Sequence, residues 1–546
     1  MKKNIAIFIA ILLIVTVSNA QQKKNLGITI TNPIIAGFYP DPSICRVGND
    51  YYIVNSSFEF YPGLPIFHSK DLAHWEQIGY AMNRPSQLDL DSTDISGGLY
   101  APTIRYINST YYIVNTLARK RKGQRGNFII SANHPAGPWS DPIWLKDANG
   151  IDPSLFQDTD GKVYFSANGR NPDSSAESKL RHIWTQEIDL KNYKFIGEKK
   201  IILVEGALHG ASNAESPHIY KKNGWYYLII AEGGTAMNHA VTVFRSKTIL
   251  GNYESNKKNP ILTHRFLGKD YPISTIGHAD MVETQNGEWW MVVLGVRPYA
   301  TKYHNIGRET FMVPVKWEEE WPVVNSGYGI VLSQQPGPKL PIFTVKQPEI
   351  IDDFNADSLA LVWNFIRTPR KIFWSLIEKK GTLRIHVLPE KITELGSPAF
   401  IGQRQTDTSC EASCEFKFTP KTEYEKAGMI LYQNSNQQYR VEKVLKNNRV
   451  FLELIKRELG NDEVLYSEAC TDETITLGAS FSNGKYDFKL KQKDGKWKTI
   501  FARAKGEVLS TIGITFTGTF IGMYASSNGV KSTNFMDVSW FSYSKK

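Results

Sequence analysis

The sequence predicts an all-β protein of two domains, a five-bladed β-propeller followed by a β-sandwich. Three observations support this prediction. A hairpin pattern recurs five times within about the first 330 residues, the remainder alternates apolar and polar residues in short runs, and no long helical pattern competes with either. With 546 residues the chain is also too long for a single compact core.

The first twenty residues are expected to lie outside the fold. Two lysines follow the initial Met, the run from Ile5 to Val17 is almost wholly apolar, and small residues precede Gln21. This order is typical of a secretory signal peptide over residues 1–20, and the apolar run is short for a membrane span. We therefore expect export to the periplasm or the extracellular space, without stable membrane insertion.

Charge and cysteine content indicate neither a nucleic-acid partner nor a disulfide framework. Residues 1–20 hold two lysines and no acid, so their removal lowers the formal net charge from +10 to +8, a mild excess. The basic cluster at 119–125 is interpreted as a solvated loop. The four cysteines show no metal-binding spacing, and a bond from Cys470 to Cys410 or Cys414 stays open.

The propeller is assigned to residues 28–333, where each repeat has the pattern of a β-hairpin. Apolar and β-branched residues flank a turn rich in Asn, Asp and Gly. A radially repeated unit of this kind predicts four-stranded blades around a central channel, against the alternative of unrelated hairpins in a sandwich. The repeats begin at Asp41-Pro42-Ser43-Ile44, Ala101-Pro102-Thr103-Ile104, Asp152-Pro153-Ser154-Leu155, Ser216-Pro217-His218-Ile219 and Ala279-Asp280-Met281-Val282.

A change of composition marks the second domain. Residues 334–350 are rich in proline and are interpreted as a stiff linker. In residues 351–546, short runs such as Leu383–Val387 and Asp487–Lys491 alternate apolar and polar side chains. This period is typical of strands with one face in water. The C-terminal part is therefore predicted to be a β-sandwich.

Acidic side chains stand at matching positions of three repeats. The first strand of each blade lines the channel of a propeller, so equivalent positions converge near the axis. The residue before the proline is Asp41 in the first repeat and Asp152 in the third, while Glu215 lies one residue earlier in the fourth. Adjacent strand residues point to opposite faces. Grouping Glu215 with the other acids therefore requires an irregularity where its strand begins.

Grouped carboxyls suit the hydrolysis of glycosidic bonds. Like charges raise one another's pKa, so one acid can stay protonated while another is ionised. Glycoside hydrolysis needs this division, with one carboxyl protonating the leaving oxygen and one carboxylate driving the attack. For a single Asp-Pro pair, ordinary turn chemistry is the competing interpretation. Ala101 at the same position of the second repeat shows that the repeat itself does not require an acid.

The motifs around these acids resemble those of glycoside hydrolase family 43. The resemblance is specific for the whole set of motifs and extends, more weakly, to the C-terminal domain. That domain looks like the concanavalin-like, jelly-roll sandwich of the family's β-xylosidases and α-L-arabinofuranosidases. Ser216 departs from the family pattern, in which many members have Gly after the acid. The motifs are Gly37–Ile44, Ser96–Pro102, Gly150–Leu155, Glu215–Tyr220, Ile276–Asp280 and Gly307–Phe311.

The resemblance implies roles for the three acids. Asp41 is expected to be the general base that activates water, and Glu215 the general acid. Asp152 is expected to orient Glu215 and to keep its pKa high by negative charge. The family inverts the anomeric carbon, so the acid and base carboxyls are expected to lie roughly 6.5–9.5 Å apart.

The resemblance also implies substrate contacts. Arg308 is expected to bind the terminal sugar, with a surface ion pair to Glu309 as the alternative. Phe58 and Tyr100 are expected to wall the pocket, with ordinary core packing as the alternative. Phe516 of the C-terminal domain is a candidate for closing one side of it.

His278 is expected near the propeller axis, close to a water or a bound Ca²⁺, with a buried core histidine as the alternative. No carboxylate cage of the calcium-binding kind is readable beside it. The sequence therefore predicts no metal ligands, and the chemistry requires no cofactor.

These features predict an inverting, exo-acting glycoside hydrolase. Its expected substrates are plant cell-wall oligosaccharides or polysaccharides derived from hemicellulose, from which it releases terminal β-D-xylose or α-L-arabinofuranose. An endo-arabinanase of the same family is one alternative, although it needs an open groove. A non-catalytic carbohydrate-binding propeller is another, although a pure binder has no need of three mutually repelling acids. The oligomeric state is left open.

Overall fold

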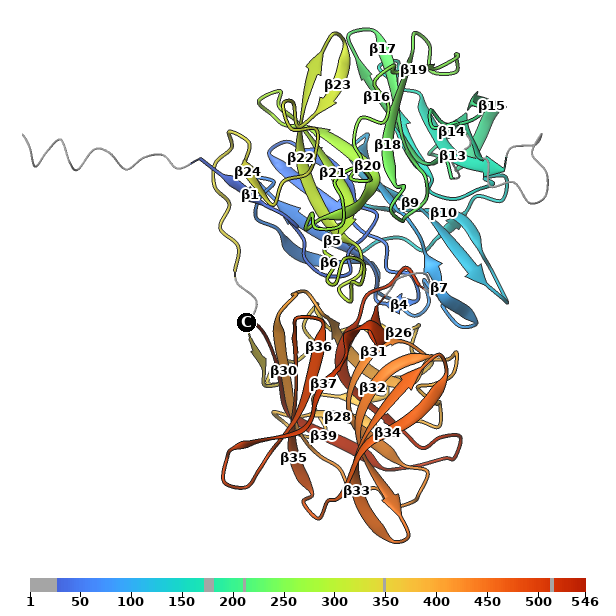
Figure 1. Cartoon of the computed structure of the whole chain (residues 1–546). Helices are drawn as coiled ribbons and strands as arrows, with labels where there is room; N and C mark the ends of the chain where they lie inside the picture. Colours follow the sequence, from blue (N-terminus) through green and yellow to red (C-terminus); the bar gives the residue numbers. More distant parts are fainter. Residues whose placement is uncertain (1–26, 171–180, 210–212, 347–349, 511–514) are drawn as a thin grey trace, which may run out of the picture.

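The computed structural model describes residues 27–170, 181–209, 213–346, 350–510 and 515–546. The expected signal segment, residues 1–20, lies outside them. Figure 1 shows two lobes, one coloured blue to yellow and the other yellow to red. Strands make up nearly all of the regular structure in the described residues, with one short 3-10 helix at Gly506–Leu509. The all-β prediction is confirmed.

The N-terminal lobe is a series of antiparallel sheets that follow one another along the chain. Each sheet continues the hairpin that begins a repeat, because apolar strands alternate with short polar turns. In chain order, the first sheet contains β2 (Ser43–Val47), β3 (Asp50–Val54), β5 (Gly63–Ser69) and β6 (Glu76–Met82), and the next contains β7 (Thr93–Leu99), β8 (Thr103–Ile107), β9 (Thr110–Lys120), β10 (Gly126–Ala132) and β11 (Ile143–Trp144). The third contains β12 (Ser154–Gln157), β13 (Val163–Arg170), β14 (Arg181–Asp189) and β15 (Lys194–Leu203), and the fourth contains β16 (Glu215–Lys222), β17 (Trp225–Glu232), β18 (Ala240–Ser246) and β19 (Glu254–Ser255). The last contains β20 (Ser274–Glu283), β21 (Trp289–Val296), β22 (Glu309–Glu318) and β23 (Trp321–Val324).

The inner strands of these sheets close a ring. β2 contacts β8, β8 contacts β12, β12 contacts β16, β16 contacts β20, and β20 returns to β2. Such radial closure is the arrangement of a β-propeller. Strands far apart in the sequence therefore start around one axis.

The predicted linker is anchored to the propeller. Its first residues form β24 (Gln334–Pro336), which pairs with β1 (Thr29–Thr31) at the start of the lobe. Further along, the backbone N–H of Gly337 donates to the carbonyl of Ile28 at 2.7 Å, and that of Phe343 to Asp71 Oδ2 at 2.7 Å. Prolines are compatible with such pairing because an edge strand leaves some N–H groups unused. Residues 347–349 lie outside the described residues.

The C-terminal lobe is a sandwich of two large antiparallel sheets. In β30 (Cys410–Lys417) buried and half-buried residues alternate, as expected for strands with one face against a core. One sheet contains β25 (Ile351–Asp352), β27 (Trp374–Ser375), β28 (Leu383–His386), β30 (Cys410–Lys417), β35 (Thr474–Ser482), β36 (Lys485–Lys491), β37 (Trp497–Lys505) and β39 (Phe535–Lys545). The other contains β29 (Ala399–Arg404), β31 (Lys426–Asn434), β32 (Gln437–Lys446), β33 (Arg449–Glu458), β34 (Asn461–Ala469) and β38 (Phe520–Ser526).

The two lobes share a strand pairing and a core. β4 (Phe60–Tyr61) of the propeller pairs with β26 (Phe365–Ile366) of the sandwich. The ring of Phe60 stacks on Phe520 with centroids 4.0 Å apart. Phe58 belongs to the same buried cluster. The sandwich is therefore packed against the end of the propeller at which Phe58 lies.

Basic side chains of the cluster at residues 119–125 form ion pairs with nearby acids of the propeller. Lys120 Nζ lies 2.6 Å from Asp89 Oδ2, and the guanidinium of Arg121 lies 2.5 Å from Asp94 Oδ1. Arg119 and Lys120 lie at the end of β9 and Lys120 is buried, so the solvated-loop interpretation is correct only for the exposed residues 121–125. All four cysteines are free thiols, so the bond left open for Cys470 is not formed. Among the described residues, no helix is long and apolar enough to cross a membrane.

Candidate active site

In four repeats, the backbone adopts the same unusual conformation where the chain reaches the propeller axis. The residue that stands before the proline, or its equivalent in the last repeat, has a positive φ in each of them. This region is uncommon for residues other than Gly, although Asp visits it more readily than most. Positive φ angles in such residues occur preferentially at functional sites. The residues are Asp41 (52°), Asp152 (53°), Ser216 (53°) and His278 (51°).

The irregularity required for Glu215 is present. The pairing of β16 with β17 shifts register between Glu215 and His218. Ser216, within this bulge, has the positive φ. A bulge of this kind redirects a side chain relative to the regular alternation of a strand. Glu215 is thereby brought close enough to Asp41 and Asp152 for their charges to affect one another's pKa.

Asp41 is held as a carboxylate. Its Oδ1 lies 2.9 Å from Arg308 Nη1, and its Oδ2 accepts a hydrogen bond from Ser56 Oγ at 2.5 Å. Burial by itself raises the pKa of Asp41, but Arg308, His278 and the Ser56 bond outweigh burial and lower it below the usual value. An ionised carboxylate is the form that a general base needs.

The pKa values of Asp152 and Glu215 are shifted upward, opposite to that of Asp41. Burial is the main cause that raises the pKa of Asp152, and the charges of Glu215 and Asp41 add to it. Burial also raises the pKa of Glu215 to about 7, with a further contribution from Asp41, although Arg181 and Arg308 oppose the shift. Because the two carboxyls interact, they titrate as a pair. Together they retain a proton near neutral pH, which is what a general acid must supply.

Arg308 is part of the site and not of a surface ion pair. Its partner is Asp41, whereas Glu309 is bound by Arg297, with Arg297 Nε 2.7 Å from Glu309 Oε2. Arg308 is also only 7% exposed. The alternative interpretation through Glu309 is therefore excluded.

Aromatic rings surround this arginine. Its guanidinium lies 5.3 Å from the ring centroid of Phe58 and 5.4 Å from that of Phe516. Phe58 is buried, and its ring centroid lies 5.2 Å from that of Tyr100, which is half-buried. Phe58 is thus packed in a buried aromatic cluster, as its core-packing alternative expects, whereas Tyr100 and Phe516 are only partly buried.

Phe516 comes from the sandwich and is tied to the propeller by its backbone. Its N–H donates to Ser96 Oγ at 2.8 Å, and its carbonyl accepts from Arg308 Nε at 3.4 Å. The turn that follows it approaches closely: a Cβ on Gly518 would lie 2.2 Å from the carbonyl oxygen of Ile306. The second domain thus contributes directly to the surroundings of Arg308.

His278 lies beside Asp41. Its Nδ1 is 3.9 Å from Asp41 Oδ1. Burial lowers the pKa of His278, so the ring is neutral at neutral pH. Across the described part of the chain, no group of three or more His, Cys, Asp or Glu side chains is arranged to hold a metal ion. The two-carboxyl chemistry requires no cofactor.

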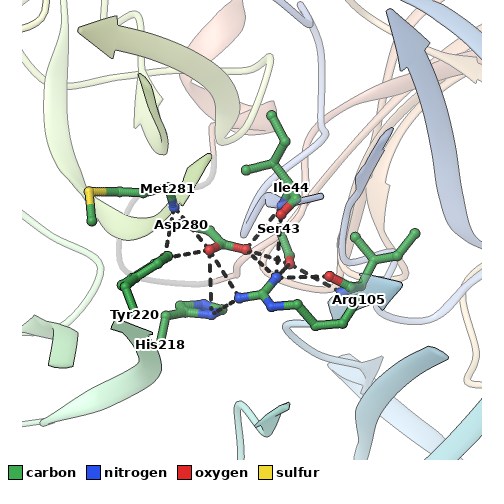
Figure 2. A network of polar contacts seen from close by, with 8 residues as sticks. Ser43, Ile44, Arg105, His218, Tyr220, Asp280 and Met281 are labelled. Atoms are coloured by element: carbon green, nitrogen blue, oxygen red, sulfur yellow. Dashed lines mark hydrogen bonds and ion pairs between the residues drawn. The ribbon is translucent and has the colours of Figure 1, made fainter. Parts of the chain in front are cut away.

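Sequence reasoning missed a polar network on the axis (Figure 2). Its centre is Asp280, which is fully buried and pairs with Arg105. A signal was available, because Arg105 is a charge at the centre of the short strand Thr103–Ile107 and Asp280 stands within an apolar run. Neither residue stands beside the proline of a repeat, so the repetition of the Asp-Pro pattern does not single them out.

Together, a carboxylate held ionised by arginine and a pair of carboxyls that keeps a proton match the two roles that a glycoside hydrolase needs. Sequence comparison identifies the family. The profile of the glycosyl hydrolases family 43 matches residues 30–322, and that of the beta xylosidase C-terminal concanavalin A-like domain matches residues 351–544. The chain belongs to glycosyl hydrolase family 43, as its motifs predict.

Relatives match nearly the whole chain. A xylosidase/arabinosidase of Butyrivibrio fibrisolvens is 42% identical over 528 residues, which cover 93% of this chain and 98% of the relative. A non-reducing end alpha-L-arabinofuranosidase of Bacteroides ovatus is 39% identical and covers 94% of each chain. The crystal structure of a xylan beta-1,4-xylosidase from Bacillus halodurans superposes with a TM-score of 0.89 at 32% identity, covering 95% of this chain and 100% of the other. The propeller and concanavalin-like sandwich are thus the architecture of this chain.

Proposed function

We propose that this glycoside hydrolase is an inverting exo-enzyme that releases a terminal pentose, β-D-xylose or α-L-arabinofuranose. Asp41 deprotonates the attacking water, Glu215 protonates the leaving oxygen, and Asp152 shares and orients the proton of Glu215. The observation that carries this proposal is the opposite displacement of pKa values, lowered for Asp41 and raised to about 7 for Glu215. Each group is then in the protonation state that its role needs.

The exo mode is supported by the second domain. Phe516 approaches Arg308 from the sandwich, so both domains contribute chain beside the acids. An endo-enzyme must instead let a polymer run past its catalytic residues on both sides. The two relatives named above are a xylosidase/arabinosidase and a non-reducing end arabinofuranosidase, which supports both pentoses as candidates.

The test is hydrolysis of aryl β-D-xyloside and aryl α-L-arabinofuranoside side by side, followed by proton NMR during the first minutes. We expect the first detectable sugar to have the inverted anomeric configuration. A retained configuration would exclude Asp41 as the base for water. Shortening of internal arabinan bonds, with neither aryl glycoside cleaved, would favour the endo-arabinanase, and binding without any cleavage would favour the carbohydrate-binding protein.

Asp41→Asn tests the base directly. We expect a loss of kcat of about 10²–10⁴-fold, since the amide cannot accept a proton from water. Binding of the free pentose, measured by calorimetry, should persist. Full turnover in a folded Asp41→Asn protein would contradict the assignment.

We further propose that residues 1–20 direct export. N-terminal sequencing of the protein recovered outside the cytoplasm should then begin at Gln21. A Leu12→Arg change, which interrupts the apolar run, should leave the enzyme in the cytoplasm. Export of that variant at the normal level would overturn the proposal.

A further inference from the structure

A buried ion pair lies at the centre of the ring of inner strands, and the proposed acid–base chemistry leaves it without a role. Arg105, from β8, reaches Asp280, from β20, with Nη1 2.8 Å from Oδ2 and Nη2 3.1 Å from Oδ1. The Asp280 side chain is fully buried, and that of Arg105 is 17% exposed. A guanidinium bound through two nitrogens fixes the orientation of its partner as well as its position.

The Asp280 carboxylate also receives bonds from other inner strands (Figure 2). Ser43 Oγ and the backbone N–H of Ile44, both in β2, donate to its Oδ2 at 2.7 and 3.0 Å. Tyr220 Oη, in β16, donates to its Oδ1 at 2.5 Å. One carboxylate therefore joins β2, β8, β16 and β20. Among the hydrogen bonds of the described residues, β12, which follows Asp152, makes none to this carboxylate.

His218 completes the surroundings of the guanidinium. Its Nδ1 lies 3.0 Å from Arg105 Nη2. Burial lowers the pKa of His218 to about 3, so the ring is neutral. Because arginine can only donate, Nδ1 is the acceptor nitrogen and the proton resides on Nε2. Arg105 is thus held by β16 as well as by β20.

The strands that meet here carry the proposed base and acid. Ser43 follows Asp41 by two residues, and Tyr220 lies in the strand that begins at Glu215. Ser43 Oγ, besides donating to Asp280, accepts from the Ile104 N–H at 3.1 Å. The chain just beyond Asp41 is therefore fixed from two neighbouring strands.

We propose that the Arg105–Asp280 pair is a positioning element, which through Ser43 and Tyr220 sets the separation of Asp41 and Glu215. The inference rests on the proposed roles of these two residues. A buried ion pair contributes little net stability, because desolvation offsets the attraction of the charges. Its geometric effect is larger, since an inverting enzyme needs a defined acid–base separation and misplacement by about 1 Å costs about 10²-fold in rate.

The experiment compares kcat and KM for an aryl pentoside in the full-length enzyme carrying Ser43→Ala, Asp280→Asn or Arg105→Met. We expect kcat to fall by about tenfold for Ser43→Ala and by about 10²-fold for the other two, with KM unchanged. Arg105→Lys, which keeps the charge but not the two-nitrogen fork, should recover only part of kcat. Ser43→Ala removes one hydroxyl and keeps both charges, so it tests the proposal even where a charge variant does not fold.

Lys221→Met is the matched control. Lys221 is also in β16, and its Nζ pairs with Asp158 Oδ1 at 2.5 Å, beyond the axial network. We expect this variant to lose a more exposed ion pair of the same strand while keeping kcat. An equal fall of kcat in the control, a change confined to KM, or an unchanged kcat in folded axial variants would each overturn the proposal.

A failure of the proposed function would give a different set of kinetic results from a failure of the positioning role. In that case Asp41→Asn and Glu215→Gln would keep their turnover, whatever the axial variants do. If those two variants lose turnover while the folded axial variants keep it, the acid–base assignment stands and the positioning role is wrong.

Discussion

Asp41 and Asp152 have the same side chain and nearly the same φ, yet their pKa values move in opposite directions. Both are buried, which raises the pKa of each. Arg308 donates to both oxygens of Asp41, Ser56 donates to Oδ2, and these contacts contribute to a lowering that outweighs burial. Asp152 has two other acids as neighbours, which add to burial. At the residue scale, the partners and not the residue type decide which acid is ionised.

The pH dependence of kcat/KM follows from these directions. As the proposed acid, Glu215 must be protonated, so activity should fall as the pH rises through about 7. Asp41 must be ionised and its pKa is lowered, so the acid limb should lie below the usual pKa of an aspartate. A pH series on an aryl pentoside measures both limbs.

Glu215→Gln should abolish the alkaline limb. It should also lose far more activity on a phenyl glycoside than on a dinitrophenyl glycoside, because a good leaving group needs no proton. An equal loss on both substrates would show that Glu215 is not the acid.

Asp152→Asn should stabilise the fold at neutral pH. The pKa of Asp152 is raised in the folded protein, so ionisation opposes folding, and the cost grows as the pH rises above the unfolded value. The amide cannot ionise and so removes that cost. We expect thermal unfolding at pH 7 to move upward by a few degrees, and the difference to vanish toward pH 4.

Asp41→Asn should change the stability of the fold in the opposite direction. The pKa of Asp41 is lowered in the folded protein, so its ionised form contributes stability that is present at neutral pH and lost on acidification. Asn at this position leaves Arg308 without its partner and should lower the melting temperature. Shifts of the same sign in both variants would contradict this electrostatic account.

At the scale of elements, two irregularities place the site. The bulge at the start of β16 turns Glu215 toward the other acids. The turn after Phe516 lies so close to Ile306 that Gly518 has no space for a side chain. The bulge redirects Glu215 from the regular alternation of its strand, and the close turn brings Phe516 to Arg308.

Gly518→Ala should therefore disturb the Phe516 contact. The new methyl group would meet the Ile306 carbonyl, so the turn must move away from the propeller. We expect a higher KM for the aryl pentoside and a smaller effect on kcat, measured by steady-state kinetics. Gly396→Ala is the control, since a Cβ there meets nothing within 4 Å. Identical kinetics for both variants would show that the turn does not affect substrate binding.

At the scale of the whole molecule, the two domains share one interface core. β4 pairs with β26, and Phe58 and Phe60 are buried in the same cluster as Phe520 of the sandwich. Independent domains normally have their own cores and small, polar interfaces. This interface instead behaves as part of the interior of both domains.

Calorimetry tests the shared core. We expect the full-length protein to unfold in a single cooperative transition, because separating the domains would expose the aromatic cluster. The propeller alone, residues 27–346, should melt at a lower temperature or aggregate. Two transitions in the full-length protein, one of them matching the isolated propeller, would show that the domains are independent.

Much of the architecture could be predicted from local patterns. Hairpin repeats and alternating strands depend on neighbours in the sequence, which is why the all-β class, the propeller and the sandwich are confirmed. The acids at Asp41, Asp152 and Glu215 could be singled out because repetition places equivalent residues around one axis. The anchoring of the linker through Gln334–Pro336 was missed, since the partner strand lies some three hundred residues earlier in the chain.

The sequence by itself determined the strands, the repeat and which acids stand at matching positions of the repeats, because these depend on residue order and periodicity. The tertiary structure alone decided which carboxyl is ionised, how Glu215 joins the others, and that Arg105 meets Asp280 at the centre. The physical reason is that pKa values and buried ion pairs depend on distances between residues from different strands. Those distances exist only once the ring of strands has closed.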